Sequence, residues 1–228
     1  MNKNKKLSDI NIEIEVIGNI YENEIVSNQV EEIKTGAFSR YSEYAGAPTF
    51  TSIILPDTLK IIGEGAFLGC EGLGEIVIPE AVDVIENYTF AYCLHLTKVV
   101  LSENVKSIGL YAFAGCAELI SINLENVEEI ADYGFTSATA LSIIDLSEVQ
   151  TVGYGAFAST SIAGELIAPQ LRKVGDYAFQ NTNLTRVEAL KLASIGEAAF
   201  EGNKALTEFE KYRIKQDKLY KPMIDTII

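Results

Sequence analysis

The sequence predicts a mostly-β solenoid of stacked coils, and three observations carry that prediction. Phenylalanine recurs along most of the chain at spacings of 29, 23, 23, 22, 22, 22 and 21 residues. Aliphatic residues recur in phase with it, and so do small and aromatic residues. Self-similarity at a period of about 20 to 50 residues is typical of solenoids and other repeat arrays. The recurring phenylalanines are Phe38, Phe67, Phe90, Phe113, Phe135, Phe157, Phe179 and Phe200.

The aliphatic columns explain why such coils would stack. Within the repeat around Phe113, Val105 and Ile108 precede the ring, and Ile122 and Leu124 follow it at places that are apolar in most other repeats. A single coil of this length cannot bury its own apolar ridge. We therefore expect equivalent residues of successive coils to pack on one another in continuous ladders.

A short strand is expected in each coil, shortly after the phenylalanine. Ser121–Leu124 alternates polar and apolar residues, which is the pattern of a strand with one buried face. Pro56, Pro79 and Pro169 follow the same place in three repeats, where proline can end a strand. One strand per coil, paired in parallel with its neighbours, follows from this pattern.

The repeats divide the chain into three parts. Residues 30–209 are expected to form eight coils. Residues 1–29 are interpreted as a tail and a capping hairpin, because 10–16 alternates apolar and polar residues, Gly18-Asn19 is a turn signal, and a second strand follows at 20–26. Residues 210–228 leave the pattern and are interpreted as a C-terminal cap or tail.

An insertion lengthens the first coil. Six extra residues lie within 39–47, and the resulting loop carries Tyr41 and Tyr44. Inserted loops of solenoids often lie on a binding face, so both tyrosines are candidate contacts. A tolerated surface loop is the alternative, because long loops cost little entropy.

The net charge of −14 limits the classes of partner. Nucleic acid is not expected, because its affinity comes from Lys and Arg neutralising phosphates. Anionic membrane surfaces are disfavoured for the same reason. A basic protein surface or a cationic ligand is electrostatically easier. Alternatively, the charge simply keeps a long solenoid in solution.

No targeting segment is visible in the sequence. The basic start lacks the apolar core of a signal peptide, and no apolar run approaches the roughly 18 residues of a membrane helix. We therefore expect a soluble, cytoplasmic protein without membrane insertion. A place at the cell surface, in the medium or in a virus particle stays open if the chain is part of a longer protein.

Cysteine, histidine and tyrosine each have a structural interpretation. Cys70, Cys93 and Cys116 follow their phenylalanines by three residues, a spacing unlike that of zinc ligands. Buried free thiols are expected, with a disulfide between adjacent coils as the alternative. The single histidine, His95, is expected on a solvated loop.

An aromatic stripe lies two residues before the phenylalanine. It consists of Tyr88, Tyr111, Tyr133 and Tyr177, and it is interrupted by Gly65, Gly155 and Ala198. We interpret it as packing along an outer edge rather than as a cofactor site. No phosphate-binding loop, metalloprotease motif or nucleophile elbow is present, so neither an enzyme nor a bound cofactor is expected.

The outward positions of the predicted strands form the candidate binding face. Ten residues after the phenylalanine, or at the aligned place, lie Ile54, Val77, Val100, Asn123, Asp145 and Ile167. Two residues earlier lie Ser52, Glu75, Lys98, Ser121, Ile143 and Glu165. Arg186 and Glu188 take these places in the next, shorter coil. Contiguous exposed aliphatics in the first three strands predict an interaction site, unless they are there only as good strand formers.

The repeat resembles a known bacterial family. The pattern V-x-x-I-G-x-x-A-F-x-x-C-x-x-L-x-x-I-x-L over Val105–Leu124 resembles the BspA-like leucine-rich repeats. The resemblance implies a curved leucine-rich repeat horseshoe, with parallel strands on the concave face and irregular or 3₁₀ segments on the convex side. Members are often surface-exposed or secreted and bind other proteins. The coil that reaches Asn183–Thr185 is one residue short, which should disturb the sheet locally.

Two hypotheses of function follow. The first is a non-enzymatic module that binds a protein partner through the concave face. The alternative is a structural or assembly subunit of a cell surface or virus particle, which contacts its neighbours through the solenoid ends, the 40–48 loop or the apolar tail 222–228. Self-association is compatible with both.

Overall fold

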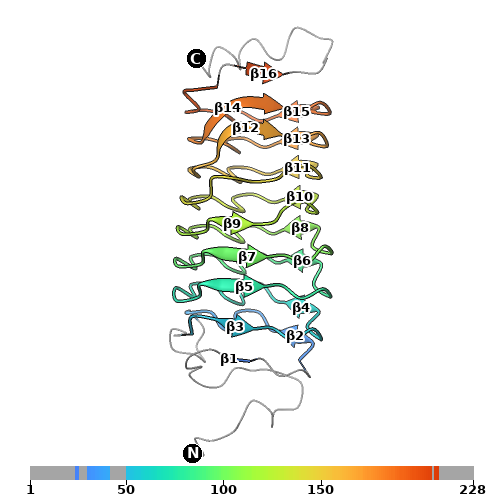
Figure 1. Ribbon diagram of the computed structural model, residues 1–228, viewed down its shortest axis with the longest axis vertical. Helices are drawn as coiled ribbons and strands as arrows, with labels where there is room; N and C mark the ends of the chain where they lie inside the picture. The colour runs from blue at the N-terminus through green and yellow to red at the C-terminus, as the bar shows by residue number, and fades with distance from the viewer. Residues whose placement is uncertain (1–23, 26–29, 42–49, 207, 211–228) are drawn as a thin grey trace, which may run out of the picture.

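The chain folds into a column of stacked coils with two strands in each regular coil, joined by turns (Figure 1). The structure, a computed structural model, describes residues 24–25, 30–41, 50–206 and 208–210. Every strand pairing is parallel, as the repeat predicts. The described residues contain no helix, and so none that could cross a membrane.

One side of the column, face A, is built from the strands that the sequence predicts. They pair in the orders β1–β3, β5–β7–β9 and β12–β14–β16, and a bridge between Ser52 and Glu75 joins β3 to β5. The strands of face A are β1 (Glu24–Ile25), β3 (Ile53–Ile54), β5 (Glu75–Val77), β7 (Lys98–Val100), β9 (Ser121–Ile122), β12 (Ala163–Ile167), β14 (Asn183–Glu188) and β16 (Glu208–Glu210).

A second sheet, face B, corrects the prediction of one strand per coil. Its inward residues are the isoleucines and valines that lie five residues before each phenylalanine. Most of these strands pair in the order β15–β13–β11–β10–β8–β6, and β2 pairs with β4. The strands of face B are β2 (Glu32–Ile33), β4 (Ile61–Ile62), β6 (Val84–Ile85), β8 (Ser107–Ile108), β10 (Glu129–Ile130), β11 (Thr151–Val152), β13 (Lys173–Val174) and β15 (Ser194–Ile195).

The core lies between the two faces and the turns, and a phenylalanine ladder runs through it. All eight repeat phenylalanines are buried. Successive rings are nearly parallel, with centroids 5.1 to 5.3 Å apart and interplanar angles of 3 to 17°. Phe50 adds an edge contact to Phe38 at 5.8 Å. The predicted ladder is therefore confirmed.

The three cysteines are free and buried beside this ladder, as predicted. Cys70 donates its thiol to the carbonyl oxygen of Phe38 at 3.2 Å, and Cys93 donates to that of Phe67 at the same distance. Cys116 repeats the contact at 3.1 Å with Phe90. Burial raises the pKa of the Cys93 and Cys116 thiols, because a thiolate would lose its hydration there.

Face A is interrupted once, at residues 143–145, which belong to no strand. Asp145 therefore lies outside the sheet, contrary to its predicted place on a strand. Its Oδ1 accepts the backbone N–H of Ser147 at 2.8 Å. This local contact is an Asx turn, which competes with strand pairing.

The short coil disturbs the sheet as a bulge rather than as a break. In the β12–β14 pair, Gly164 lies opposite Leu184 but Glu165 lies opposite Arg186, so Thr185 is the additional residue. These are nevertheless the longest strands of the structure. The bulge takes up the irregular coil length while the pairing continues on both sides.

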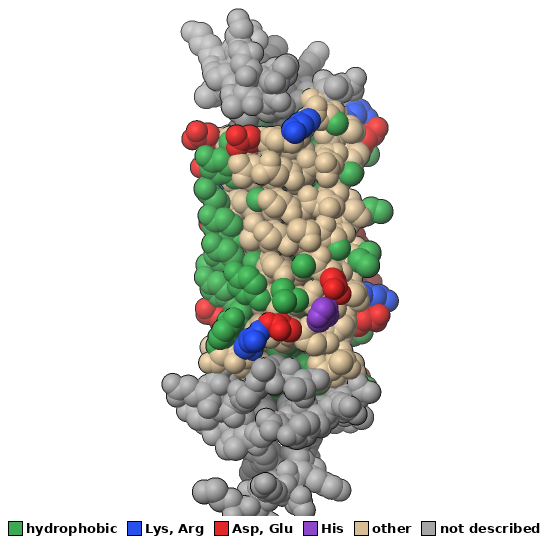
Figure 2. Space-filling model, turned by 90° about the vertical axis from the view of Figure 1, so that its left-hand side faces the viewer, with side chains coloured by type: hydrophobic (Ala, Val, Ile, Leu, Met, Phe, Trp, Pro, Cys, Tyr) green, Lys and Arg blue, Asp and Glu red, His purple; other side chains and the backbone are tan. Residues whose placement is uncertain are grey.

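The column is nearly straight in both views (Figures 1 and 2), so face A has little concavity along the stack. Turns, without 3₁₀ helix, connect the strands in the described residues. The expected capping hairpin lies outside the described residues except for β1, which pairs in parallel with β3 as a further strand of face A. The C-terminal tail also lies outside them except for Glu210, which ends β16 on face A. The boundaries at 29 and 209 stay predictions.

Candidate partner-binding face

The exposed aliphatic surface of face A is centred on two residues. The side chains of Ile54 and Val77 are 61% and 63% exposed, and they lie at equivalent places on neighbouring coils. Between them is a shallow pocket of about 260 Å³. Its walls include Leu55, Asp57 and Pro79 as well as both aliphatics. An apolar centre with acidic residues at its margin is the general anatomy of an interaction site.

Val100 differs from these two residues. It pairs with Val77 across β5 and β7, as the sequence predicts, but its side chain is only half-buried rather than largely exposed. On the next coil, Asn123 is half-buried as well. The exposed apolar row is therefore shorter than the three strands proposed from the sequence.

Asn123 has a structural role that its place in the row does not suggest. Its Oδ1 accepts the N–H of Leu101 at 2.7 Å, and its Nδ2 donates to the Leu101 carbonyl oxygen at 3.0 Å. The side-chain amide thus replaces a backbone peptide where β9 ends. These groups already have partners, so Asn123 contributes shape rather than free polar groups to the face.

The C-terminal half of face A carries a second exposed region. Ile143, in the interruption, is 81% exposed, and Ile167 on β12 is 55% exposed. Beyond them, Arg186 contacts Glu165 at 3.1 Å and Glu188 at 3.2 Å. These three charged residues are thus engaged with one another.

The remaining predicted residues flank the first region. Glu75 and Lys98 are exposed and lie opposite each other on β5 and β7. Ser52 is half-buried at its bridge to Glu75. Tyr41, at the start of the inserted loop, is 68% exposed, whereas Tyr44 lies outside the described residues.

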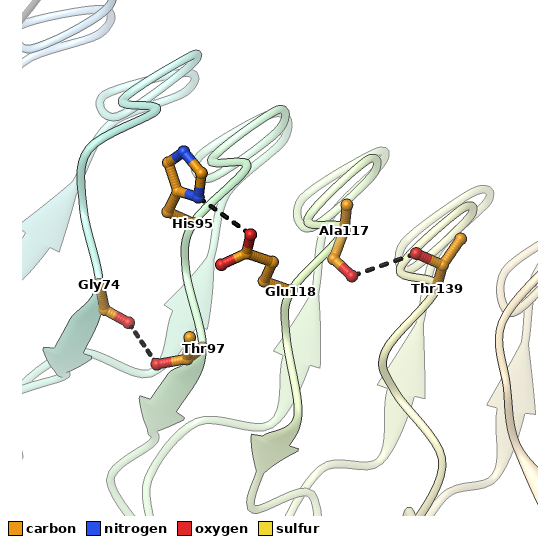
Figure 3. A network of polar contacts seen from close by, with 6 residues as sticks. All are labelled: Gly74, His95, Thr97, Ala117, Glu118 and Thr139. Atoms are coloured by element: carbon orange, nitrogen blue, oxygen red, sulfur yellow. Dashed lines mark hydrogen bonds and ion pairs between the residues drawn. The ribbon is translucent and has the colours of Figure 1, made fainter.

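His95 lies on an exposed turn, as predicted (Figure 3). Its Nδ1 lies 3.1 Å from Oε1 of Glu118 on the next coil. The same edge carries hydroxyl-to-carbonyl contacts between coils, from Thr97 to Gly74 at 2.9 Å and from Thr139 to Ala117 at 3.1 Å. Within the described residues, no group of three or more His, Cys, Asp or Glu side chains is placed to hold a metal ion.

A tyrosine ladder runs along the turns. Tyr88 stacks on Tyr111 at 5.3 Å, and Tyr111 stacks on Tyr133 at 4.5 Å. The ladder continues through Tyr154 to Tyr177 with tilted rings at 5.0 and 5.4 Å. This stacking supports the predicted packing role of the tyrosines. Figure 2 shows a column of hydrophobic side chains along the left edge of the stack.

Tyr154 is the member that the sequence does not predict. It comes one residue before Gly155, which occupies the tyrosine place in its coil. The other four tyrosines have φ angles of 54 to 58°, a left-handed conformation that is uncommon for aromatic residues. In the sequence, the signal for Tyr154 is an aromatic residue next to a gap in the stripe. The ring contacts identify Tyr154 as a member of the ladder.

The comparisons with known proteins agree with this architecture. A family model described as a BspA type leucine rich repeat region, with six copies, matches residues 40–163 and 128–216. No curated protein matches the chain. A leucine-rich repeat protein from Bacteroides ovatus is 26% identical, with a TM-score of 0.65, and the match covers 83% of this chain and 55% of that one.

Two further solved structures share the fold. A leucine rich cell surface protein from Faecalibacterium prausnitzii is 23% identical with a TM-score of 0.56, covering 86% of this chain and 49% of that one. The T. pallidum leucine-rich repeat protein is 22% identical with a TM-score of 0.59, covering 90% and 82%. This chain thus spans about half the length of the first two proteins. Since the family model covers most of its residues, the chain belongs to the BspA-type leucine-rich repeat family.

Proposed function

We propose that this chain is a non-enzymatic module that binds a protein partner through face A, with Ile54 and Val77 at the centre of the contact. Solenoids of this family are commonly protein-interaction or surface modules. The observation that carries the proposal is the pair of exposed aliphatics over a shallow pocket between two parallel-bridged coils. A few well-packed residues near the centre of an interface usually contribute most of its affinity.

Folding does not explain the two aliphatics. Equivalent outward places carry Asn123 on β9's coil and Glu188 on β14, and the coils stack there as well. The inward neighbours Ile53 and Ile76 already supply the buried surface of this region. Ile54 and Val77 thus add little to the core while exposing apolar area to water, which favours a role in binding.

The charged neighbours indicate how such a contact would be oriented. Asp57 and Glu75 line the pocket, and Lys98 lies on the next strand. In an interface these charges form a polar rim that sets orientation and association rate more than affinity. Tyr41 extends the proposed surface at the inserted loop, and Ile143 with Ile167 offers a second, separate contact toward the C-terminal end.

The test compares Val77→Asp with Ile61→Asp. Ile61, on β4 of face B, is 50% exposed, so the two substitutions place a charge on comparably exposed aliphatics of opposite sheets. Affinity capture from the source cells should recover a specific protein with wild type and Ile61→Asp, and lose it with Val77→Asp, because contact would desolvate the new charge. Circular dichroism verifies that both variants fold. Retention of the partner by folded Val77→Asp would refute the proposed centre.

A further inference from the structure

A long trough lies on the other side of the molecule, along the outward edge of face B. It has a volume of about 670 Å³ and crosses five successive coils, from Val84 to Asp176. One wall is formed by outward residues of the face B strands and the other by the turns that lead into the tyrosine ladder. The surface is separate from face A and from the function proposed above.

The floor of the trough is bare backbone because of close packing between coils. A Cβ atom added to Gly109 would lie 2.7 Å from the backbone nitrogen of Asn87, and one added to Gly153 would lie 2.5 Å from that of Asp132. Such distances do not occur between real atoms, so the stack requires glycine here. The resulting depression runs parallel to the column axis.

Side-chain oxygens that accept a backbone N–H recur along the trough at every second coil. Asp132 Oδ1 accepts the N–H of Tyr154 at 2.7 Å, and Asp176 Oδ1 accepts that of Glu197 at 2.7 Å. Asn87 makes the same contact with Leu110 at 2.8 Å two coils earlier, beside Glu86. These hydrogen bonds fix the side chains of Asn87, Asp132 and Asp176, which we call the three stations of the trough. Each aspartate has a second carboxylate oxygen for a ligand.

The trough as a whole is acidic and has one aromatic wall. Four carboxylates line it, those of Glu86, Glu129, Asp132 and Asp176, against one cation, Lys173. Tyr154 also lines it, and its ring is tilted by 51 and 55° from the neighbouring tyrosines, so its face is not covered by parallel stacking. Carboxylates beside a partly exposed tyrosine ring favour a cationic side chain.

The spacing of the stations defines the shape of the ligand. Two coils are about 9.6 Å apart, since paired strands are about 4.8 Å apart. Successive turns of a polyproline II helix are about 9.3 Å apart and bring every third residue to the same side. In a β-strand, by contrast, every third residue alternates sides. A peptide in polyproline II conformation with cations at every third residue therefore matches the stations.

The chain itself contains a segment with cations at this spacing. Lys215, Lys218 and Lys221 are spaced by three residues and are followed by Pro222. We propose that the trough binds residues 215–221 of a second copy of this chain. The lengths of chain favour a second copy over the same one. In the described coils six residues, 78–83, carry the chain from face A to face B, whereas four residues separate Glu210 of face A from Lys215 in the sequence. Pairing of this head-to-tail kind generates open chains of molecules rather than closed dimers.

The first experiment measures binding of a fluorescently labelled peptide, residues 213–222, to the full chain by anisotropy. The double variant Asp132→Asn/Asp176→Asn removes two charges but retains the backbone contacts, as Asn87 shows at the equivalent place. We expect it to weaken binding about tenfold, the sum of two exposed charge pairs. Glu103→Gln/Glu125→Gln removes two exposed charges outside the trough and should leave binding unchanged. Equal weakening by both double variants would overturn the site.

A second peptide tests the spacing. It contains the same residues with its three lysines adjacent, so its net charge is unchanged. We expect it to bind several-fold more weakly, because adjacent lysines would have to splay their side chains apart to contact stations two coils apart. Equal affinity for the two peptides would mean that the acidic protein attracts any lysine-rich peptide, whatever the spacing of its lysines. That result would overturn the proposed match.

The source of the peptide is tested by sedimentation velocity of the full chain. Wild type should associate with rising concentration, and Lys215→Gln/Lys218→Gln/Lys221→Gln should remain monomeric. Association should also decline with salt, because the contacts are between exposed charges. A monomeric wild type, or association that persists in the triple variant, would refute the second copy as the occupant.

Discussion

The backbone N–H of Tyr154 donates a hydrogen bond of 2.7 Å to Oδ1 of Asp132 on the preceding coil. This contact fixes the backbone of Tyr154 beside Gly155, where its ring continues the tyrosine ladder at 5.0 Å from Tyr133. The ladder is therefore continuous although its sequence column is not. One aspartate thus links the stacking of two coils to the aromatic edge of the molecule.

This contact predicts unequal effects of two substitutions. Asp132→Ala removes the acceptor and should lower the free energy of unfolding by about 1 kcal/mol, the usual value for one hydrogen bond. Asp132→Asn keeps an acceptor oxygen and should be close to wild type, as the native Asn87 indicates. Urea unfolding of both variants measures the difference. Equal losses would mean that the charge, rather than the hydrogen bond, stabilises the coil.

Phenylalanine substitutions should depend on position in the stack. Phe113 stacks between Phe90 at 5.3 Å and Phe135 at 5.1 Å, so Phe113→Ala should reduce the free energy of unfolding by about 3–5 kcal/mol. Phe200→Ala affects the last described coil and should reduce it less, because repeat stability is a sum over neighbouring coils. Equal losses in urea unfolding would argue against that additive behaviour.

The cysteines should be unreactive in the folded protein. Cys93 and Cys116 are fully buried, and burial raises the pKa of both thiols, so the reactive thiolate is scarce at neutral pH. Titration with a thiol reagent should detect few thiols natively and three after denaturation without reductant. Detection of a single thiol after denaturation would instead indicate a disulfide.

The tyrosine ladder predicts a loss of stability at high pH. Burial, assisted by the Tyr154 hydroxyl, raises the pKa of Tyr133 to about 12. An unfolded tyrosine has a pKa of about 10, so the folded state retains this proton longer. The stabilisation is complete below about pH 10 and is lost as pH rises toward 12.

Comparison of wild type with Tyr133→Phe isolates this contribution. The variant cannot ionise at this position, so its stability should fall less steeply over the same pH range. Urea unfolding at several alkaline pH values provides the measurement. Identical slopes would show that Tyr133 has an ordinary pKa in the folded protein.

The parts of the fold that repeat in every coil could be predicted from the sequence. The burial of Phe113 and the inward place of Ile76 on β5 follow from columns that persist over many coils. Face B was missed because its strands have only two residues, such as Ser107–Ile108, which cannot establish an alternating pattern. The column of isoleucines and valines five residues before each phenylalanine could belong to a buried turn as well as to a strand.

The candidate site could be predicted only in part for a related reason. The exposure of Ile54 and Val77 follows from strand alternation. The roles of Asn123 and Asp145 depend on where their polar atoms point, and both bond to the backbone instead of facing a ligand. Sequence position predicts the side of the sheet, but it does not predict which hydrogen bond a short polar side chain will choose.

The alternation of Asn87, Asp132 and Asp176 with Leu110, Tyr154 and Glu197 has a consequence for how this protein can be lengthened or shortened. Acceptor coils alternate with donor coils, so the exchangeable module is a pair of coils, 45 or 44 residues from one acceptor to the next. Removing an acceptor coil would place one donor coil on another and leave a backbone amide without its side-chain acceptor. Removing a pair of coils restores the order, so a change in length by a pair of coils retains this pattern of contacts.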